Sequence, residues 1–171
     1  NKTGSLVSGA QTDYNGSPTG YTKDPQETIN YISKHDNQTL YDINMYALPM
    51  GTTMADRIRA QNVGLSLVTF SQGVPFIHAG SDMLRSKSLD RDSYNSGDWF
   101  NRLDFTYQTN NFGVGLPIAE KNESNWGIME PYLANPDFKP DQSDIIHSKD
   151  IFLDWLAIRS SSKLFHLETL E

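Results

Sequence analysis

Apolar residues give a strand-like pattern just before the chain reaches its most polar cluster. The run Ile29–Ile32 fits a strand that feeds a buried sheet, and we expect that strand at about residues 28–34. The strand stops at His35-Asp36-Asn37, which is too polar to continue into a core. Chemistry in a parallel α/β barrel is placed at the carboxyl ends of the strands, so these three residues are candidates for a functional site.

A helical pattern follows after a Pro/Gly turn. Thr53, with Asp56 three residues later, forms a weak capping box at a helix start, and Gly73 suits the position just past a helix end. The apolar residues between them recur at near-helical spacing: Met54, Ile58, Leu65 and Val68. The pattern predicts a helix from Thr53 to about Ser71.

The same order of elements then begins again. Val74–Gly80 is a short apolar run with a proline near its start, which predicts a second buried strand. Residues 81–142 show no sustained period, and so long a stretch in a compact domain indicates a functional loop. Ser143 is a good cap for a last helix, which we expect to continue to about Leu164.

The predicted order is therefore strand, helix, strand, helix, preceded by a long Gly-, Ser- and Pro-rich loop at residues 1–27. This order favours the α/β class, with parallel strands and right-handed crossovers. Two strands cannot form a stable sheet alone, and 171 residues are fewer than the roughly 250 of a complete (β/α)8 barrel. We expect the chain to be a piece of a larger α/β protein.

Composition narrows the function by exclusion. The formal net charge of -7 and the pI of about 5.0 argue against nucleic acid as a partner, because binding it needs many Lys and Arg side chains. The sequence has no cysteine, which excludes disulfides, thiol catalysis and thiolate metal sites. It has no signal-peptide pattern and no apolar run of the ~18 residues that a membrane span needs, so we expect no membrane partner. The compartment stays unknown.

Several kinds of active site also lack their motifs. A serine hydrolase is disfavoured because no G-x-S-x-G elbow is present, and no Gly-rich phosphate loop follows either strand. His78 and Asp82 are two ligands short of a zinc site, so a hydrogen-bonded rim histidine is the better interpretation of His78. Asp90 and Asp92 resemble the start of a calcium loop whose later positions do not fit. We therefore assign no metal ligand.

A carboxylate beside an imidazole can do acid-base work, stabilise a developing cation, or hold a ligand hydroxyl. His35 and Asp36 could equally be a hydrogen-bonded pair without a catalytic role. The strand ends and the long loop are rich in Asp, Asn, Arg, Tyr and Trp, a mixture that suits carbohydrate. Most loop aromatics can instead be the loop's own small core, which we expect for Phe100, Phe105 and Phe112.

Several segments resemble one enzyme family. The run from His35 to Leu40 resembles the fourth signature region of the α-amylase-type glycoside hydrolases, and the longer run from Tyr31 to Asp42 resembles its pullulanase and limit dextrinase branch. The segments 13–18, 76–80 and 110–117 are similar to that branch, and so are the long run from Leu84 to Asn101 and the last predicted helix. The resemblance covers essentially the whole chain.

The resemblance implies a partial (β/α)8 TIM barrel, with strands 7 and 8, their helices and a long loop after strand 8. Strand 7 and helix 7 would occupy residues 28–72, with the strand at 28–36. Strand 8, the long substrate loop and helix 8 would occupy residues 74–164. Residues 165–171 would begin the connection to a following domain.

The resemblance also implies roles for particular residues. Asp36 would be the carboxylate that stabilises the oxocarbenium-like transition state, and His35 would hydrogen-bond hydroxyls of the sugar at the cleavage site. Asp92, with Arg91 and Tyr94 nearby, would line the neighbouring subsite on the non-reducing side. We include Asn37 among the substrate-binding residues.

The implied reaction is hydrolysis of α-1,6-glucosidic bonds with retention, in pullulan, limit dextrins or branched maltooligosaccharides. The Asp nucleophile and the Glu acid/base would precede residue 1, so the chain would need the remainder of its own polypeptide and would be inactive alone. No cofactor is required, although calcium is common in relatives of the complete protein. Two alternatives stay open: a non-catalytic α-glucan-binding module or decayed homologue, and a fragment without independent function.

Overall fold

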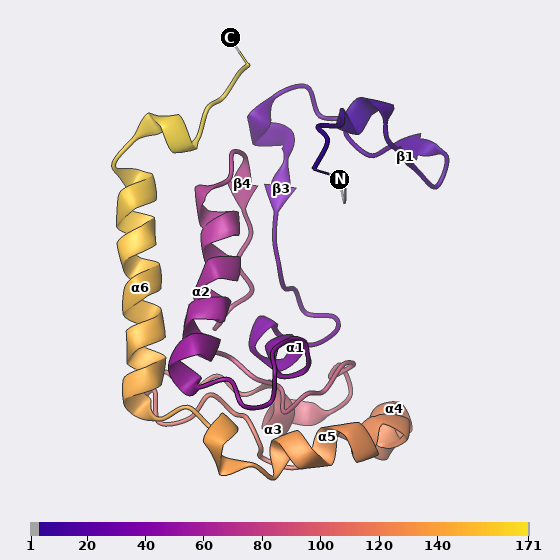
Figure 1. The fold of residues 1–171 in the computed structure, drawn as a ribbon, viewed down its shortest axis with the longest axis vertical. Coiled ribbons are helices and arrows are strands. Elements are labelled where there is room, and N and C mark those ends of the chain that lie inside the picture. The colour runs from indigo at the N-terminus through magenta and orange to yellow at the C-terminus, as the bar shows by residue number, and fades with distance from the viewer. Residues whose placement is uncertain (1–3, 171) are drawn as a thin grey trace.

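The computed structural model describes residues 4–170, and Figure 1 shows its two longest helices side by side along one flank. These helices are α2 (Met54–Phe70) and α6 (Gln142–Ser160). Short helices lie across one end of this pair, and the amino-terminal segment extends at the other end. The first three residues of the expected 1–27 loop, and the last residue of segment 165–171, lie outside the described residues.

Helix α2 confirms the predicted first helix. The Thr53 side chain caps it by accepting a hydrogen bond from the Asp56 backbone N–H at 3.2 Å. Gly73 follows the helix with φ of +94°, and a Cβ there would lie 2.4 Å from the carbonyl oxygen of Thr28. Glycine is therefore required for the close approach of the chain after α2 to the segment before the first parallel strand.

Helix α6 confirms the predicted last helix but begins and ends at other residues. Asp141, not Ser143, is its N-cap, and Asp141 and Asp144 form a reciprocal capping box. The helix ends at Ser160 rather than near Leu164. A short 3-10 turn, η5 (Lys163–Phe165), follows it.

Helix α1 (Leu40–Ala47) was not predicted. The Thr39 hydroxyl caps it by accepting a hydrogen bond from the Asp42 N–H at 3.1 Å. The predicted 81–142 loop is irregular for much of its length, but it also contains short helical elements. These are α3 (Gly97–Asn101), α4 (Ala119–Asn122), η3 (Glu123–Asn125), α5 (Trp126–Leu133) and η4 (Pro136–Phe138).

The predicted 1–27 loop contains a small hairpin. Its strands β1 (Asp13–Tyr14) and β2 (Ser17–Pro18) pair antiparallel. Asn15 and Gly16 both have positive φ, as a tight two-residue hairpin turn requires. Two 3-10 turns flank the hairpin, η1 (Gly9–Gln11) and η2 (Pro25–Glu27).

The second sheet is also a single pair of strands. β3 (Ile29–Asn30) and β4 (Val74–Pro75) lie parallel, with Ile29 opposite Val74. The direction of this pair is the predicted one, but each strand is only two residues long, so the strands expected at 28–36 and 74–80 are wrong over most of their length.

The prediction of a partial TIM barrel is therefore wrong for this chain. Residues 4–170 are mostly helical, with two sheets of two strands each. A parallel pair normally needs neighbours on both edges. No third strand joins β3 and β4 among the described residues. After β3 the chain continues without regular structure through Ser33 to the polar cluster at His35-Asp36-Asn37.

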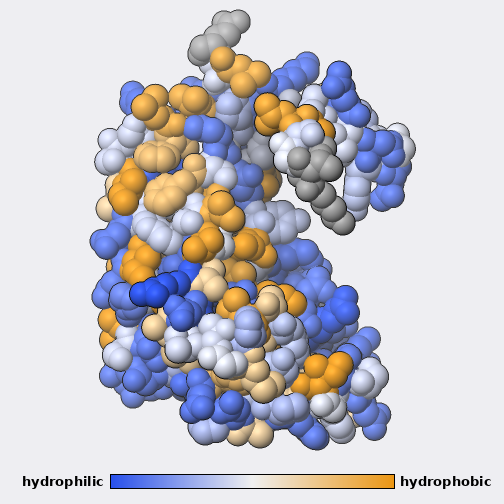
Figure 2. Space-filling model, in the orientation of Figure 1, coloured by the Kyte–Doolittle hydropathy of each residue, from blue (hydrophilic) through white to orange (hydrophobic). Residues whose placement is uncertain are grey.

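The core lies between the helices and the loop that follows β4. Its largest cluster joins α1, α2, the loop and the start of α6: Tyr41, Met45, Ile58, Met83, Leu84, Leu89, Phe112, Met129, Phe138 and Ile145. A smaller cluster of Leu40, Leu65 and Phe152 packs α1 and α2 against α6. Hydrophobic side chains also reach the surface, including the flank formed by α6 (Figure 2). No helix in the described part of the chain is long and apolar enough to cross a membrane.

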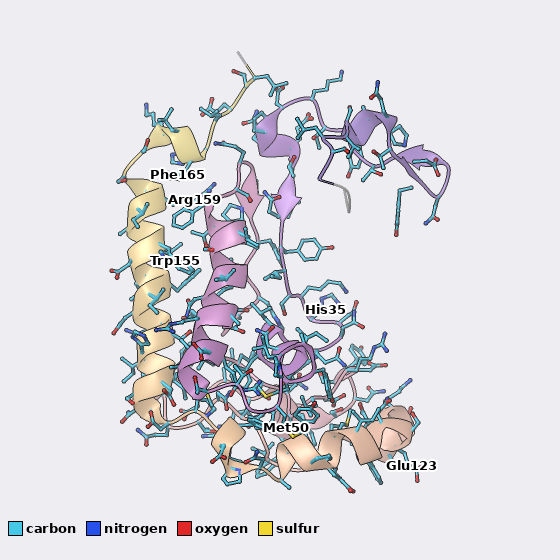
Figure 3. The ribbon with its side chains drawn as sticks, viewed as in Figure 1. His35, Met50, Glu123, Trp155, Arg159 and Phe165 are labelled. Atoms are coloured by element: carbon cyan, nitrogen blue, oxygen red, sulfur yellow. The ribbon has the colours of Figure 1, made fainter. Side chains whose placement is uncertain are left out.

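Arg159 of α6 fixes the far end of α2. Its guanidinium donates hydrogen bonds to the carbonyls of Thr69, Ser71 and Gly73 at 2.6, 2.9 and 3.0 Å. In Figure 3 Arg159 lies beside Trp155 and Phe165, near the top of the helix pair. These last carbonyls have no partner within a helix, so a cation from the next helix satisfies them.

Candidate active site

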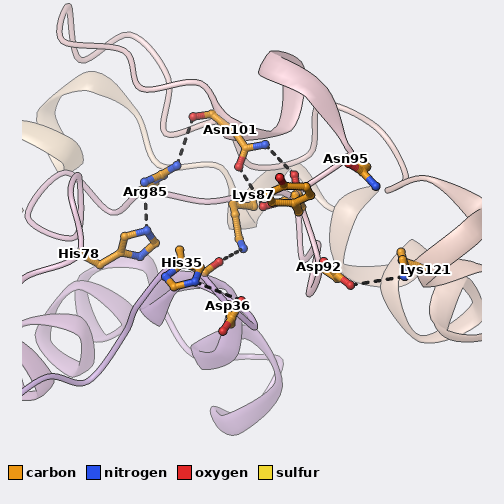
Figure 4. A pocket seen from close by; sticks show the side chains of 11 residues that line it. His35, Asp36, His78, Arg85, Lys87, Asp92, Asn95, Asn101 and Lys121 are labelled. Carbon is orange, nitrogen blue, oxygen red and sulfur yellow. Dashed lines mark hydrogen bonds and ion pairs between the residues drawn. The ribbon is translucent and has the colours of Figure 1, made fainter.

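A cavity of about 630 Å³ opens where the segment between β3 and α1 meets the loop after β4 (Figure 4). Four of the six residues proposed for the site line it: His35, Asp36, Asp92 and Tyr94. Residues 31–39 join a two-residue strand to α1 without regular structure, so side-chain contacts must fix the first two. The cavity therefore brings together residues that lie more than fifty positions apart in the sequence.

Asp36 presents its carboxylate to the cavity with 61% of the side chain exposed. Lys34 donates a hydrogen bond to one carboxylate oxygen, and His35 Nε2 lies 3.4 Å from the other. These contacts lower the pKa of Asp36, chiefly through the Lys34 hydrogen bond, with smaller contributions from the charges of His35 and Lys87. Asp36 is therefore an ionised carboxylate at neutral pH.

Asn37 and Arg91 do not line this cavity. Arg91 Nε donates a hydrogen bond to Asn37 Oδ1 at 3.1 Å, and Asn37 adopts a left-handed conformation with φ of +62°. The contact ties the residue after Asp36 to the residue before Asp92. The structure thus gives this pair a connecting position, and its direct contact with a substrate stays a prediction.

Asp90 organises the part of the loop that carries Asp92. Its fully buried carboxylate accepts hydrogen bonds from the Asp92 N–H at 3.0 Å and from the Ser96 hydroxyl at 2.5 Å. Asn122 donates a third at 3.2 Å. The Asp92 carboxylate itself lies 3.8 Å from the ammonium of Lys121. Asp92 is thus held at the cavity wall by its backbone.

Tyr94 is the most exposed aromatic side chain of the cavity, with 93% of its surface accessible. Of the loop aromatics expected to form a small core, Phe100 and Phe112 are buried, which confirms that prediction for both. Phe105 is 71% exposed, so the prediction is wrong there. An exposed ring beside polar groups can pack against the apolar face of a sugar.

His78 and Arg85 form a second polar layer of the cavity. The sequence had led us to interpret His78 only as a hydrogen-bonded rim histidine. Arg85 Nη1 lies 3.1 Å from His78 Nε2, and Ser33 Oγ lies 3.2 Å from Nδ1. A guanidinium can only donate, so Nε2 accepts and Nδ1 carries the proton. Burial, with the Arg85 charge, lowers the pKa of His78 to about 4, so the ring is neutral. Arg85 also donates to the Asn101 carbonyl at 3.2 Å.

Lys87 and Asp42 are buried charged residues that sequence reasoning missed as parts of the site. The Lys87 ammonium donates a hydrogen bond to the His35 carbonyl at 3.1 Å, and the Lys87 N–H donates to Asp42 Oδ2 at 2.8 Å. The Ser86 hydroxyl donates to the other Asp42 oxygen at 2.5 Å. Burial raises the pKa of Asp42 to about 6, because the ionised form loses its hydration.

The loop that carries Lys87 has an unusual backbone. Leu84, Ser88 and Leu89 all have positive φ, between 51° and 67°. Each bulky residue in this conformation costs about 1–2 kcal/mol, so tertiary contacts must hold it. Both leucines are fully buried.

No group of three or more His, Cys, Asp or Glu side chains within residues 4–170 is arranged to hold a metal ion. The candidate pair His78 and Asp82 has no third ligand of these types within that range. Calcium in a complete protein stays a prediction.

Known proteins share both the sequence and the shape of this chain. Residues 107–171 match the family model described as "Alpha-1,6-glucosidases, pullulanase-type, C-terminal". The chain is 52% identical over 170 residues to the chloroplastic pullulanase 1 of Arabidopsis thaliana and 42% identical over 166 residues to the pullulanase of Klebsiella aerogenes. The chain belongs to the pullulanase-type glycoside hydrolase family.

Solved pullulanases have the same local fold. A crystal structure of the Klebsiella pneumoniae pullulanase complexed with maltotriose matches 95% of this chain, with a TM-score of 0.86 and 42% identity. The pullulanase of Bacillus acidopullulyticus matches 87% of it, with a TM-score of 0.59 and 28% identity. The matches name pullulanases, so the limit dextrinase part of the expected branch has no support from them.

The chain corresponds to a small part of each pullulanase relative. The aligned region comprises 99% of this chain but 18% of the Arabidopsis pullulanase. For the Klebsiella aerogenes pullulanase it comprises 97% of this chain but 15% of the relative. It likewise spans 15% of the Klebsiella pneumoniae crystal structure. The similarity therefore assigns the family, while the activity of a complete protein has to be argued from the site.

Proposed function

We propose that this chain is part of a debranching glycoside hydrolase that cleaves α-1,6-glucosidic bonds in pullulan, limit dextrins or branched maltooligosaccharides with retention. The observation that carries the proposal is the ionised Asp36 carboxylate beside His35 at the wall of a polar cavity of about 630 Å³. The maltotriose complex of the Klebsiella pneumoniae relative supports an α-glucan as ligand.

In this proposal Asp36 acts by electrostatics. Glycosidic cleavage passes through an oxocarbenium-like transition state, so a fixed anion beside the sugar stabilises charge that develops only there. The Asp nucleophile and the Glu acid/base, which the family resemblance requires, come from outside these 171 residues. No cofactor takes part in this scheme.

The other cavity residues would hold the sugar in place. His35 is exposed at the cavity wall and can hydrogen-bond hydroxyls of the ring at the cleavage site. Asp92 accepts hydroxyl hydrogen bonds in the neighbouring subsite, and the exposed ring of Tyr94 packs on a sugar face. The Asn37–Arg91 contact would connect the two subsites.

The decisive experiment is Asp36→Asn in the complete enzyme. The substitution keeps the size of the side chain and removes its charge, so kcat on pullulan should fall by at least roughly 10³-fold while KM and the melting temperature change little. Asp154→Asn, on the exposed face of α6, is the control and should leave kcat unchanged. Near-normal turnover by Asp36→Asn would overturn the assignment. A wild type that binds maltotriose without turnover would favour a glucan-binding module.

A further inference from the structure

Lys87 is a buried cation at the wall of the catalytic cavity. It lines the cavity with Asp36, although only 1% of its surface is exposed. A buried ammonium loses its hydration, so it persists only where neighbouring groups compensate. The site as proposed above gives it no contact with the reacting sugar. Its position therefore needs another explanation.

Hydrogen bonds to the Asp42 carboxylate fix the backbone around Lys87. Its N–H donates to Asp42 at 2.8 Å, and the Ser86 hydroxyl donates to the second oxygen of that carboxylate at 2.5 Å. Ser86 in turn accepts a hydrogen bond from the Ser88 N–H at 2.8 Å. Asp42 lies in the first turn of α1 and is fully buried. Hydrogen bonds between one helix and one loop thus hold the lysine backbone in place.

The Lys87 side chain reaches the backbone that carries the catalytic residues. Nζ donates to the His35 carbonyl at 3.1 Å, across 52 positions of sequence (Figure 4). This carbonyl belongs to the peptide bond between His35 and Asp36, inside a segment without regular structure. A hydrogen bond to it fixes the peptide plane from which both side chains project.

We propose that Lys87 is a positioning residue. Asp42 holds the Lys87 backbone, the Lys87 ammonium fixes the His35–Asp36 peptide, and its charge faces the Asp36 carboxylate. The inference rests on the proposed function of Asp36. Catalysis needs the charged group in place before the transition state forms, and a shift of about 1 Å can lower the rate about 10²-fold. Lys87 therefore acts through Asp36 and not on the sugar.

The surrounding charges make the effect testable by pH. Asp36, Asp42 and Asp90 attract the Lys87 ammonium, whereas Arg85 repels it. Asp36 in turn faces the cations Lys34 and Lys87 and the imidazole of His35. A positive charge favours the ionised form of a carboxyl group, so removal of the Lys87 charge raises the pKa of Asp36. The acid limb of the kcat profile should then move to higher pH.

The test is Lys87→Met in the complete enzyme, because methionine fills a similar volume without charge. We expect kcat on pullulan to fall about 10- to 100-fold, KM to change less than about threefold, and the acid limb to move upward. Lys87→Arg keeps the charge and should keep the acid limb in place. Lys149→Met, whose lysine pairs with Asp150 on α6, is the matched control and should change none of these values.

A double-mutant cycle separates positioning from general damage. If Lys87 acts through Asp36, Lys87→Met should lower kcat far less in the Asp36→Asn background than in the wild type. Equal losses in both backgrounds, or an unmoved acid limb in Lys87→Met, would overturn the proposal.

A crystal structure of Lys87→Met tests positioning independently of the reaction. We expect residues 34–37 to shift, and an unmoved backbone there would also overturn the proposal. Full turnover by Asp36→Asn would overturn the proposed function instead, so the two failures are distinguishable. Lys87→Gln, which keeps a donor, is the substitute if Lys87→Met does not fold.

Discussion

At the scale of residues, the carboxylates that face the cavity differ from those that hold the loop in place. Asp36 and Asp92 present exposed carboxylates to the cavity, whereas Asp42 and Asp90 are fully buried and accept hydrogen bonds from the loop. The four carboxylates thus form two pairs with different environments. An exposed carboxylate keeps its charge available, and a buried one fixes the backbone around it.

Asp92→Ala in the complete enzyme tests the neighbouring subsite. A hydrogen bond between a carboxylate and a sugar hydroxyl contributes about 1.5–3 kcal/mol, so kcat/KM on maltosyl-branched oligosaccharides should fall about 10-fold or more. The loss should lie mainly in KM, because the contact is already formed with the bound substrate. Asp154→Ala is the control. Unchanged kinetics in Asp92→Ala would remove this residue from the site.

The site residues that the sequence predicted were those whose functional groups can be recognised from residue type and local context. His35, Asp36, Asp92 and Tyr94 line the cavity as polar or aromatic groups in segments that could not enter a core. Lys87 was not found as a site residue, because its importance depends on burial and on a contact to a backbone carbonyl 52 positions away. Neither property is written in local sequence.

At the scale of elements, local signals predicted the long helices and missed the short ones. Thr53 with Asp56 marked the start of α2, and the helix that follows, with its apolar residues at helical spacing, is seventeen residues long. Thr39 with Asp42 is the same pair of residue types, and it starts α1. An eight-residue helix shows too few apolar repeats to outweigh the strand-like run before it.

The strands failed for a different reason. Ile29–Ile32 has the composition of a strand, but a strand exists only where another one pairs with it. β3 and β4 pair over two residues, and the remaining predicted strand residues have no ladder partner among the described residues. Pairing is a long-range property, so the pattern of one segment could not define the length of its strand.

Arg57 tests how a single side chain joins elements. It lies in α2, is 1% exposed, and donates hydrogen bonds to the carbonyls of Thr52 at 3.2 Å, Pro49 at 3.1 Å and Met50 at 3.3 Å. Arg57→Met would remove all three hydrogen bonds, and of the three carbonyls the one of Pro49 would keep the hydrogen bond from the Thr52 N–H at 3.0 Å. A hydrogen bond from a charged donor contributes about 1.5–3 kcal/mol, so loss of these contacts should lower the free energy of unfolding by about 3 kcal/mol.

Arg59 provides the matched control for that measurement. It lies two residues further along α2, its side chain is 78% exposed, and it pairs with Asp56 at 2.9 Å. Exposed ion pairs contribute about 0–1 kcal/mol, so Arg59→Met should change the free energy of unfolding by less than that. Denaturant unfolding of both variants gives the comparison. Equal losses would show that the buried contacts of Arg57 do not stabilise the turn before α2.

At the scale of the whole molecule, the described residues leave apolar surface uncovered beside the parallel pair. Ile29, Tyr31, Val74 and Phe76 are all exposed, and the rings of Tyr31 and Phe76 contact each other edge-on with centroids 6.3 Å apart. The pullulanase relatives contain several times more residues than this chain. Apolar side chains gathered at a strand pair are a suitable contact for further polypeptide.

This arrangement predicts that the isolated 171-residue chain does not hydrolyse pullulan. It contains the proposed stabilising carboxylate Asp36, but a retaining mechanism also needs a nucleophile and an acid about 5–5.5 Å apart. Release of reducing sugar should therefore be absent for the isolated chain and present for the complete enzyme, with complete-enzyme Asp36→Asn as the low-activity reference. Thermal melting by circular dichroism shows whether the isolated chain folds. Turnover by a cooperatively melting isolated chain, lost on Asp36→Asn, would show that these residues contain a whole active site.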